Sequence, residues 1–150
     1  DAIRPWQHVL EPLMGYLLMA EALHQDQSNS FTFNFGPKIA DQVTVREVIQ
    51  FTQDWMKLNH VENSGALENL EFRAEQSFKE SSVLMLDSSN ASKDLGWSPR
   101  FSWTEAINLT LNWYLSYVNG ADPSKLVAKP ILEVWGLNYS SKYNNGSNVF

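Results

Sequence analysis

The sequence feature that most constrains this chain is a ten-residue run near its start, RPWQHVLEPL at residues 4–13. Arg4 carries a permanent cation whose planar fork of donors suits phosphate oxygens. Pro5 cannot donate to a strand ladder and alternation follows it, so residues 5–9 are predicted to be extended. Pro12 suits a first-turn position, where its missing N–H costs nothing, so a helix is predicted to open at Glu11-Pro12. Arg4 is therefore expected where a strand leads into a helix, a common place to hold a ligand.

Composition places the chain among globular domains and excludes several classes of function. It has 150 residues, 43% hydrophobic and 13% aromatic, enough for a real core. The net charge of −6 disfavours nucleic acid and anionic membranes as partners. The absence of cysteine excludes disulfides and thiol chemistry and fits a cytoplasmic protein, while the three histidines lack metal-ligand spacing. No apolar run reaches the length of a membrane span, and the start without Met suggests a piece of a longer protein.

Hydrophobic spacing predicts the first elements. A helix is expected over residues 12–24, with further apolar residues widening its stripe, so that it packs on more than one side. The residues expected to face inward are Leu13, Tyr16, Leu17, Ala20 and Leu23. Residues 31–35 alternate aromatic and polar side chains and are predicted to form a strand, which Gly36-Pro37 ends.

Two capping boxes predict the starts of the main later helices. Thr44 with Glu47 opens a helix that runs to about Leu58, and Ser102 with Glu105 opens another. The second is expected to turn Ala106, Ile107, Thr110, Trp113, Tyr114 and Tyr117 inward. Between the two helices, strands are predicted over residues 70–73 and 83–86. A short helix capped by residues 87–89 is predicted to end at Gly96, which suits a left-handed cap.

Four segments together resemble a known family. They are RPWQHVLEPL with the following GYLL and Ala20-Glu21; NFGP at residues 34–37; Leu86-Asp87, Ala91, Leu95-Gly96-Trp97 and Pro99; and Glu105-Ala106-Ile107, Thr110 and Trp113-Tyr114. In this order they resemble the CDP-glucose 4,6-dehydratases of the extended short-chain dehydrogenase/reductase superfamily. The resemblance covers residues 1–118 as a carboxy-terminal substrate-binding domain. Residues 119–150 match nothing in the family and are expected to form a partly flexible tail.

The resemblance implies a fold and a reaction. The fold class is α/β: a small mixed helix-strand domain that packs on an NAD-binding Rossmann half, which is absent from this chain and is supplied in cis or in trans. NAD takes a hydride from carbon 4 of the glucose, water leaves across carbons 5 and 6, and the hydride returns at carbon 6. The seven glycines never form a dinucleotide-binding turn, and no usable tyrosine–lysine pair is present. No catalytic, cofactor-binding or metal-binding residue is therefore assigned, and the chain alone is expected to be inactive.

Three residues are expected to bind the substrate, a nucleotide-diphosphate sugar for which CDP-glucose is expected. Arg4 stands where relatives contact the diphosphate, Trp6 occupies the adjacent aromatic position, and Glu80 stands where relatives can reach the ribose. Taken alone, Arg4 is more readily a surface residue in an ordinary ion pair, and the surrounding signature reverses that interpretation. For Trp6, core packing and pocket lining are equally open. His8 and Glu11 are interpreted as structural, with Glu11 capping the helix, rather than as an acid–base pair. Gln76 and Ser77 stand where relatives outside this family often have a second phosphate-binding arginine. The second half of the predicted substrate-binding site therefore departs from the pattern.

Two other functions stay open. A sister epimerase or reductase of the same superfamily would share this architecture, and an acidic catalytic pair in the absent half would favour the dehydratase. A non-catalytic binding or assembly subunit is the alternative from a different class. The full enzyme is expected to be a homodimer.

Overall fold

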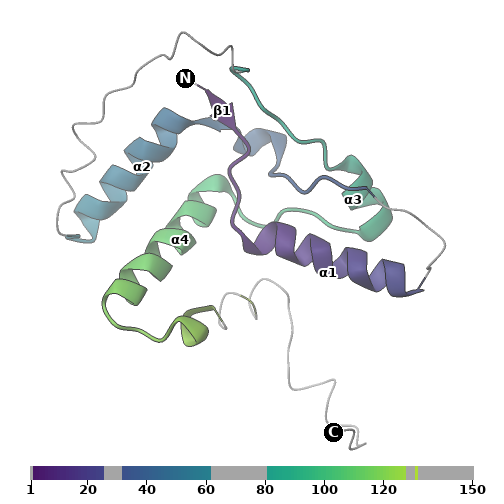
Figure 1. Cartoon of the computed structure of the whole chain (residues 1–150). Coiled ribbons are helices and arrows are strands. Elements are labelled where there is room, and N and C mark those ends of the chain that lie inside the picture. Colours follow the sequence, from purple (N-terminus) through teal and green to yellow (C-terminus); the bar gives the residue numbers. More distant parts are fainter. Residues whose placement is uncertain (1, 26–31, 62–80, 128–130, 132–150) are drawn as a thin grey trace, which may run out of the picture. The chain divides into compact units, whose positions relative to one another are not determined.

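A computed structural model of the chain describes residues 2–25, 32–61, 81–127 and 131 (Figure 1). The chain divides into two compact units, residues 1–111 and 112–150. The described residues form a mixed but helix-rich arrangement with one small sheet, which is compatible with the predicted α/β class. The predicted division into residues 1–118 and 119–150 stays a prediction. Most of the second segment, and all of the predicted strand at residues 70–73, lie outside the described residues.

The sheet pairs two very short strands. β1 (Ile3–Arg4) runs antiparallel to β2 (Val43–Thr44), with Ile3 opposite Thr44 and Arg4 opposite Val43. On the other side of β1, Ile3 forms a parallel bridge with Val83. The predicted strand at residues 83–86 is therefore wrong beyond its first residue, because β1 is too short to pair with more.

Residues 5–9 also differ from the prediction. The strand ends at Arg4, the amide of Trp6 donates back to the Arg4 carbonyl at 3.0 Å, and Val9 lies in a turn. The strand lies before Pro5 rather than after it, because Pro5 has no N–H to donate and prevents the ladder from continuing past Arg4. Arg4 is the last residue of β1, and α1 (Leu10–Gln25) is the next helix, so the expectation that Arg4 stands where a strand leads into a helix is confirmed.

α1 contains Pro12 in its first turn, as predicted. It begins at Leu10, one residue before Glu11 and two residues before the predicted range of 12–24. The side of α1 that packs on the rest of the unit carries Leu10, Glu11 and Gly15. The residues predicted to face inward instead face outward: Leu13, Tyr16, Leu17, Ala20 and Leu23 are all exposed. The prediction chose the wrong side, because α1 is apolar around most of its circumference and its pattern does not single out one face.

Both predicted capping boxes are confirmed. At the start of α2 (Val45–Leu58), the Glu47 carboxylate accepts a hydrogen bond from the amide of Thr44 at 2.7 Å, and the Glu47 amide donates to the Thr44 hydroxyl. The bond from the Thr44 amide lowers the pKa of Glu47. Ser102 and Glu105 form the same pair at the start of α4 (Trp103–Val118). Hydrogen bonds of this kind satisfy amides that the first turn of a helix leaves without partners.

The short helix α3 (Ser89–Leu95) is also confirmed. The Asp87 carboxylate accepts from the amide of Ser89 at 2.9 Å, and Gly96 ends the helix with φ 64°. In α4, Ala106 is buried and Trp113 is partly buried, but Tyr114 and Tyr117 are exposed, against the prediction. Within the second unit, the Trp113 and Tyr117 rings stack at 5.3 Å.

The core of the first unit forms around Phe35, Ala91 and Trp97, and is completed by the partly buried Met14, Leu18, Phe33 and Leu95. Phe35 and Trp97 meet edge to face with centroids 5.1 Å apart. α1 approaches Phe35 so closely that a Cβ at Gly15 would lie 2.7 Å from Phe35 Cζ. Glycine at this position is therefore required by packing.

The predicted strand at residues 31–35 is not formed in its described part. Residues 32–38 have no regular secondary structure, although burial does alternate, with Thr32 and Asn34 exposed and Phe35 buried. A strand needs a neighbour to pair with, and the described residues supply none here. Among the described residues no helix has the length and hydropathy required to span a membrane.

Candidate functional site

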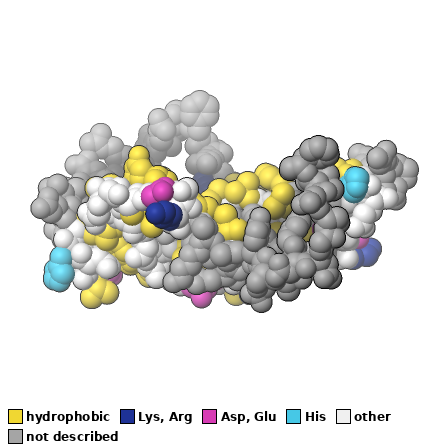
Figure 2. Space-filling model, turned by 90° about the horizontal axis from the view of Figure 1, so that it is seen from below, with side chains coloured by type: hydrophobic (Ala, Val, Ile, Leu, Met, Phe, Trp, Pro, Cys, Tyr) yellow, Lys and Arg dark blue, Asp and Glu magenta, His cyan; other side chains and the backbone are white. Residues whose placement is uncertain are grey.

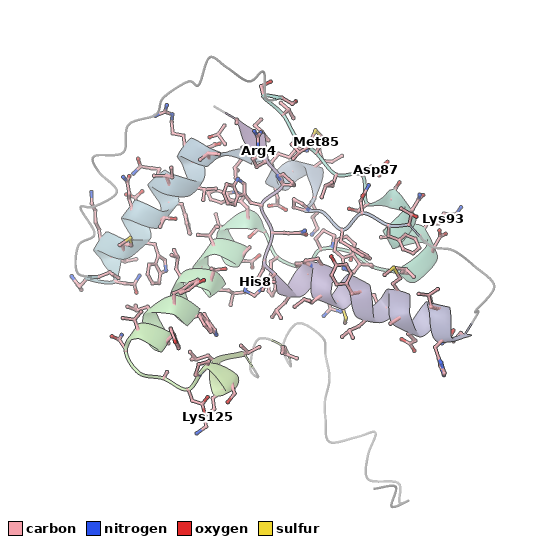
Figure 3. The ribbon with its side chains drawn as sticks, viewed as in Figure 1. Arg4, His8, Met85, Asp87, Lys93 and Lys125 are labelled. Carbon is pink, nitrogen blue, oxygen red and sulfur yellow. The ribbon has the colours of Figure 1, made fainter. Side chains whose placement is uncertain are left out.

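Arg4 is held in place by two backbone carbonyls, one within β1 itself and one in the neighbouring segment that contains Ser81. Its Nη1 donates to the carbonyl of Ile3 at 2.8 Å and to that of Ser81 at 3.2 Å. The segment that carries Ser81 is fixed in turn, because the amide of Ile3 donates to the Ser82 carbonyl and the amide of Leu84 donates to the Ile3 carbonyl. Figure 3 shows Arg4 and Met85 on these neighbouring stretches of chain. The guanidinium is thus ordered where the strand ends.

Trp6 lies two residues further on and is partly buried. Its indole Nε1 is buried, and nothing in the described part of the chain accepts a hydrogen bond from it. A buried donor without an acceptor costs about 1–3 kcal/mol. Glu80, the third predicted substrate-binding residue, lies outside the described residues. The structure therefore places Arg4 and Trp6 in one turn of chain and does not test Glu80.

Gln7 ties this turn to the segment that contains Phe35. Its amide Nε2 donates to the Phe35 carbonyl at 2.7 Å, while its Oε1 is buried and has no donor within the described residues. The side-chain amide therefore fixes the link between β1 and α1. This role was not predicted, because no local sequence pattern indicates that the Gln7 side chain will bind the distant carbonyl of Phe35.

The contacts of His8 fit the structural role that was predicted for it. Its Nδ1 accepts from the amide of Leu10 at 3.3 Å, and its ring meets Phe101 edge to face at 5.8 Å. Burial of the imidazole lowers the pKa of His8 below its ordinary value. Because Nδ1 must be unprotonated to accept this bond, the neutral imidazole is the form that fits.

The lowered pKa of His8 predicts a pH dependence of stability. The folded chain binds fewer protons at this site than the unfolded chain, so stability rises with pH up to the ordinary histidine pKa of about 6.5. Acidification from pH 7 to pH 5 is expected to lower the denaturant midpoint. In His8→Gln this loss is expected to shrink, whereas His24→Gln, at an exposed position of α1, should keep it. Parallel slopes for His8→Gln and the parent chain would contradict this account.

Glu11 joins the start of α1 to the loop that precedes α4. It is 2% exposed, and its Oε1 accepts from the amides of Arg100 at 2.7 Å and Phe101 at 2.8 Å. Its backbone carbonyl also accepts from the indole Nε1 of Trp97 at 3.1 Å. The prediction that Glu11 caps its own helix is wrong. A carboxylate buried in this way is retained because two amides satisfy it.

Three of the four segments that carry the family resemblance meet in the first unit. The side-chain amide of Asn34 donates to the Asp87 carbonyl at 3.3 Å, and the amide of Gly36 donates to the Ser88 hydroxyl at 2.8 Å. Together with the bonds of Glu11 and Trp97, these contacts bring all but the last of the four recognised segments into one core. Much of the signature is therefore explained by packing, whereas Arg4 lies outside that core.

A cavity of about 460 Å³ opens among the same segments, and neither Arg4 nor Trp6 lines it. Its wall is formed by residues 36–39, 85–89, 92 and 97–99. Among the described residues no group of histidine and acidic side chains is arranged to hold a metal ion. The cavity and the predicted diphosphate site are thus separate places.

The chain is similar to a known dehydratase. The chain is 36% identical over 122 residues to CDP-glucose 4,6-dehydratase of Salmonella typhimurium. The resemblance to the CDP-glucose 4,6-dehydratases is confirmed. The match covers 81% of this chain but only 32% of the relative, so the chain spans about a third of that dehydratase. No protein-family model matches the chain.

Proposed function

We propose that this chain is the substrate-binding part of an NAD-dependent CDP-glucose 4,6-dehydratase of the extended short-chain dehydrogenase/reductase superfamily. The observation that carries the proposal is its 36% identity over 122 residues to a curated dehydratase. The enzyme converts its nucleotide-diphosphate sugar to the 4-keto-6-deoxy sugar. A homodimer in the cytoplasm fits this role.

The sequence of this chain supports a role in binding the substrate rather than NAD. NAD, when bound by the rest of the enzyme, supplies the hydride-accepting chemistry at carbon 4 of the sugar. The residues of this chain do not fit the cofactor, because no glycine-rich turn is present in the sequence. Its contribution is to bind and orient the substrate, which lowers the barrier by fixing the reacting geometry.

Arg4 is the residue on which the diphosphate is proposed to bind. Its guanidinium is already ordered by the carbonyls of Ile3 and Ser81, so little side-chain freedom remains to be lost on binding. Guanidinium–phosphate bonds are charge-assisted and belong to the stronger class of hydrogen bonds. Since the chain has a net charge of −6, a local arginine is needed to hold an anion on it. Trp6 and Glu80 are proposed to complete the site.

Substitution of Arg4 tests the proposal through binding rather than turnover. In the complete enzyme, Arg4→Ala is expected to weaken CDP binding about 10-fold to 100-fold, as expected for loss of a charge-assisted bond of about 1.5–3 kcal/mol. Arg4→Lys should fall between, because an ammonium keeps the charge but not the planar fork. Isothermal titration calorimetry measures the dissociation constants.

Arg100→Ala is the matched control. It removes the same charge from an exposed side chain, while the backbone amide that reaches Glu11 remains. Its affinity for CDP should stay within twofold of the parent enzyme. Equal affinities for Arg4→Ala and Arg100→Ala would remove Arg4 from the diphosphate site.

A further inference from the structure

The direction of the Arg4 guanidinium depends on a carbonyl from a distant part of the chain. Nη1 of an arginine has two N–H groups, and in Arg4 it meets two backbone acceptors, the carbonyls of Ile3 and Ser81. The Ile3 carbonyl belongs to the preceding residue and is always nearby. The Ser81 carbonyl lies 77 positions along the chain, at 3.2 Å from Nη1. The orientation of the planar fork is therefore fixed only if the segment that contains Ser81 is itself held in place.

That segment is held on two sides by different partners. On the side of β1, the Ser82 carbonyl accepts from the amide of Ile3 at 2.8 Å, and the Leu84 amide donates to the Ile3 carbonyl at 3.1 Å. The backbone groups of Val83, which lie between these two, bond instead to the side chain of Ser81. The Ser81 hydroxyl donates to the Val83 carbonyl at 2.6 Å and accepts from the Val83 amide at 3.4 Å. The hydroxyl thus closes a small turn that begins at the carbonyl bound by Arg4.

Hydrogen bonds are the main restraint on this segment, because its side chains contribute little packing. Residues 81–87 are all exposed. A serine hydroxyl that bonds to the backbone two residues further on stabilises a local turn of this kind. Without the hydroxyl, the backbone groups of Val83 would bond to water and the turn would open. The Ser81 carbonyl would then move away from Arg4.

The orientation of one arginine matters more in this chain than in a basic one. The sequence has 11 lysines and arginines against 17 acidic residues. Lysine and arginine side chains are also sparse on the face of the molecule that Figure 2 shows. A guanidinium binds a phosphate strongly when its fork of donors faces the phosphate oxygens. An Arg4 side chain that has lost its fixed direction should therefore bind the diphosphate more weakly.

We infer that Ser81 is a positioning residue for the diphosphate site. Its hydroxyl fixes the turn that presents the Ser81 carbonyl to Arg4, and it influences the substrate only through Arg4. The inference rests on the proposed function, in which Arg4 binds the diphosphate.

Substitution of Ser81 in the complete enzyme tests the inference, with this chain in place of the matching segment of the Salmonella typhimurium dehydratase. Ser81→Ala is expected to weaken CDP binding about threefold to tenfold in calorimetric titrations, as expected for loss of one hydrogen bond. KM for CDP-glucose should rise by the same factor while kcat stays unchanged, because the diphosphate lies away from the reacting sugar carbons. Ser81→Thr keeps the hydroxyl and should bind CDP as the parent enzyme does. Ser82→Ala is the matched control and should also leave binding unchanged, because Ser82 takes part through its backbone carbonyl.

A double-mutant cycle with Arg4→Ala separates positioning from a general structural effect. In the Arg4→Ala background, adding Ser81→Ala should cause no further loss of CDP affinity, because the guanidinium that the turn orients is already gone. An equal loss in both backgrounds, or a Ser81→Thr variant as weak as Ser81→Ala, overturns the inference. If Arg4→Ala weakens binding and Ser81→Ala does not, the inference falls and the proposed function stands. If neither variant weakens binding, the inference and the proposed diphosphate site both fall.

Discussion

Replacing Trp97 by alanine is expected to lower the free energy of unfolding by about 4 kcal/mol, the range observed for buried tryptophans. Trp97 is 2% exposed, packs edge to face on Phe35, and donates its indole N–H to the Glu11 carbonyl. The substitution opens a cavity and leaves that carbonyl without its donor. Since 1 kcal/mol shifts the melting temperature by about 2–4 °C in a chain of this size, a fall of about 10 °C is expected.

Two further variants separate these contributions. Trp97→Phe keeps most of the buried area but loses the N–H, so a cost of about 1–2 kcal/mol is expected. Tyr114→Ala truncates an aromatic residue that is 58% exposed and should change stability by less than about 0.5 kcal/mol. Urea unfolding followed by circular dichroism gives the three values. If Trp97→Ala costs no more than Tyr114→Ala, the core has been assigned incorrectly.

The second large effect is expected at Glu11. Glu11→Ala should destabilise the chain by about 3 kcal/mol, because the amides of Arg100 and Phe101 lose their shared acceptor. Glu11→Gln keeps an oxygen at the same place without the charge, and a cost of about 1 kcal/mol is expected. Chemical unfolding at pH 7 measures both changes.

Glu21→Ala provides the control for Glu11, because it removes a carboxylate from an exposed position of the same helix. Its effect should remain below about 0.5 kcal/mol. Hydrogen exchange adds a local readout, since the amides of Arg100 and Phe101 should exchange faster in Glu11→Ala. Unchanged exchange at these two amides would show that the carboxylate does not hold the loop.

Local chemistry made several elements predictable from sequence. The pairs Thr44–Glu47 and Ser102–Glu105 form the expected capping boxes, because each is decided within four residues. Gly96 ends α3 with φ 64°, because glycine adopts the left-handed conformation without strain.

Long-range contacts were not predictable. The hydrogen bond from the Arg100 amide to the Glu11 carboxylate joins residues 89 positions apart, and no sequence pattern near Glu11 predicts it. The packed side of α1 could not be chosen, because leucines and methionines surround the helix. For residues 32–35 the alternation in burial was predicted correctly and the strand was not, since a strand depends on a neighbour that sequence spacing does not provide.

The measurement that tests the central claim most directly is turnover of CDP-glucose by the complete protein. With this chain in place of the matching third of the Salmonella typhimurium dehydratase, and with NAD present, formation of the 4-keto-6-deoxy sugar is expected. The Arg4→Ala version should raise KM about 10-fold or more, and the Arg100→Ala version should leave it unchanged. A folded protein that binds NAD but neither binds CDP-glucose nor converts it would contradict the assignment of this chain as the substrate-binding part of the dehydratase.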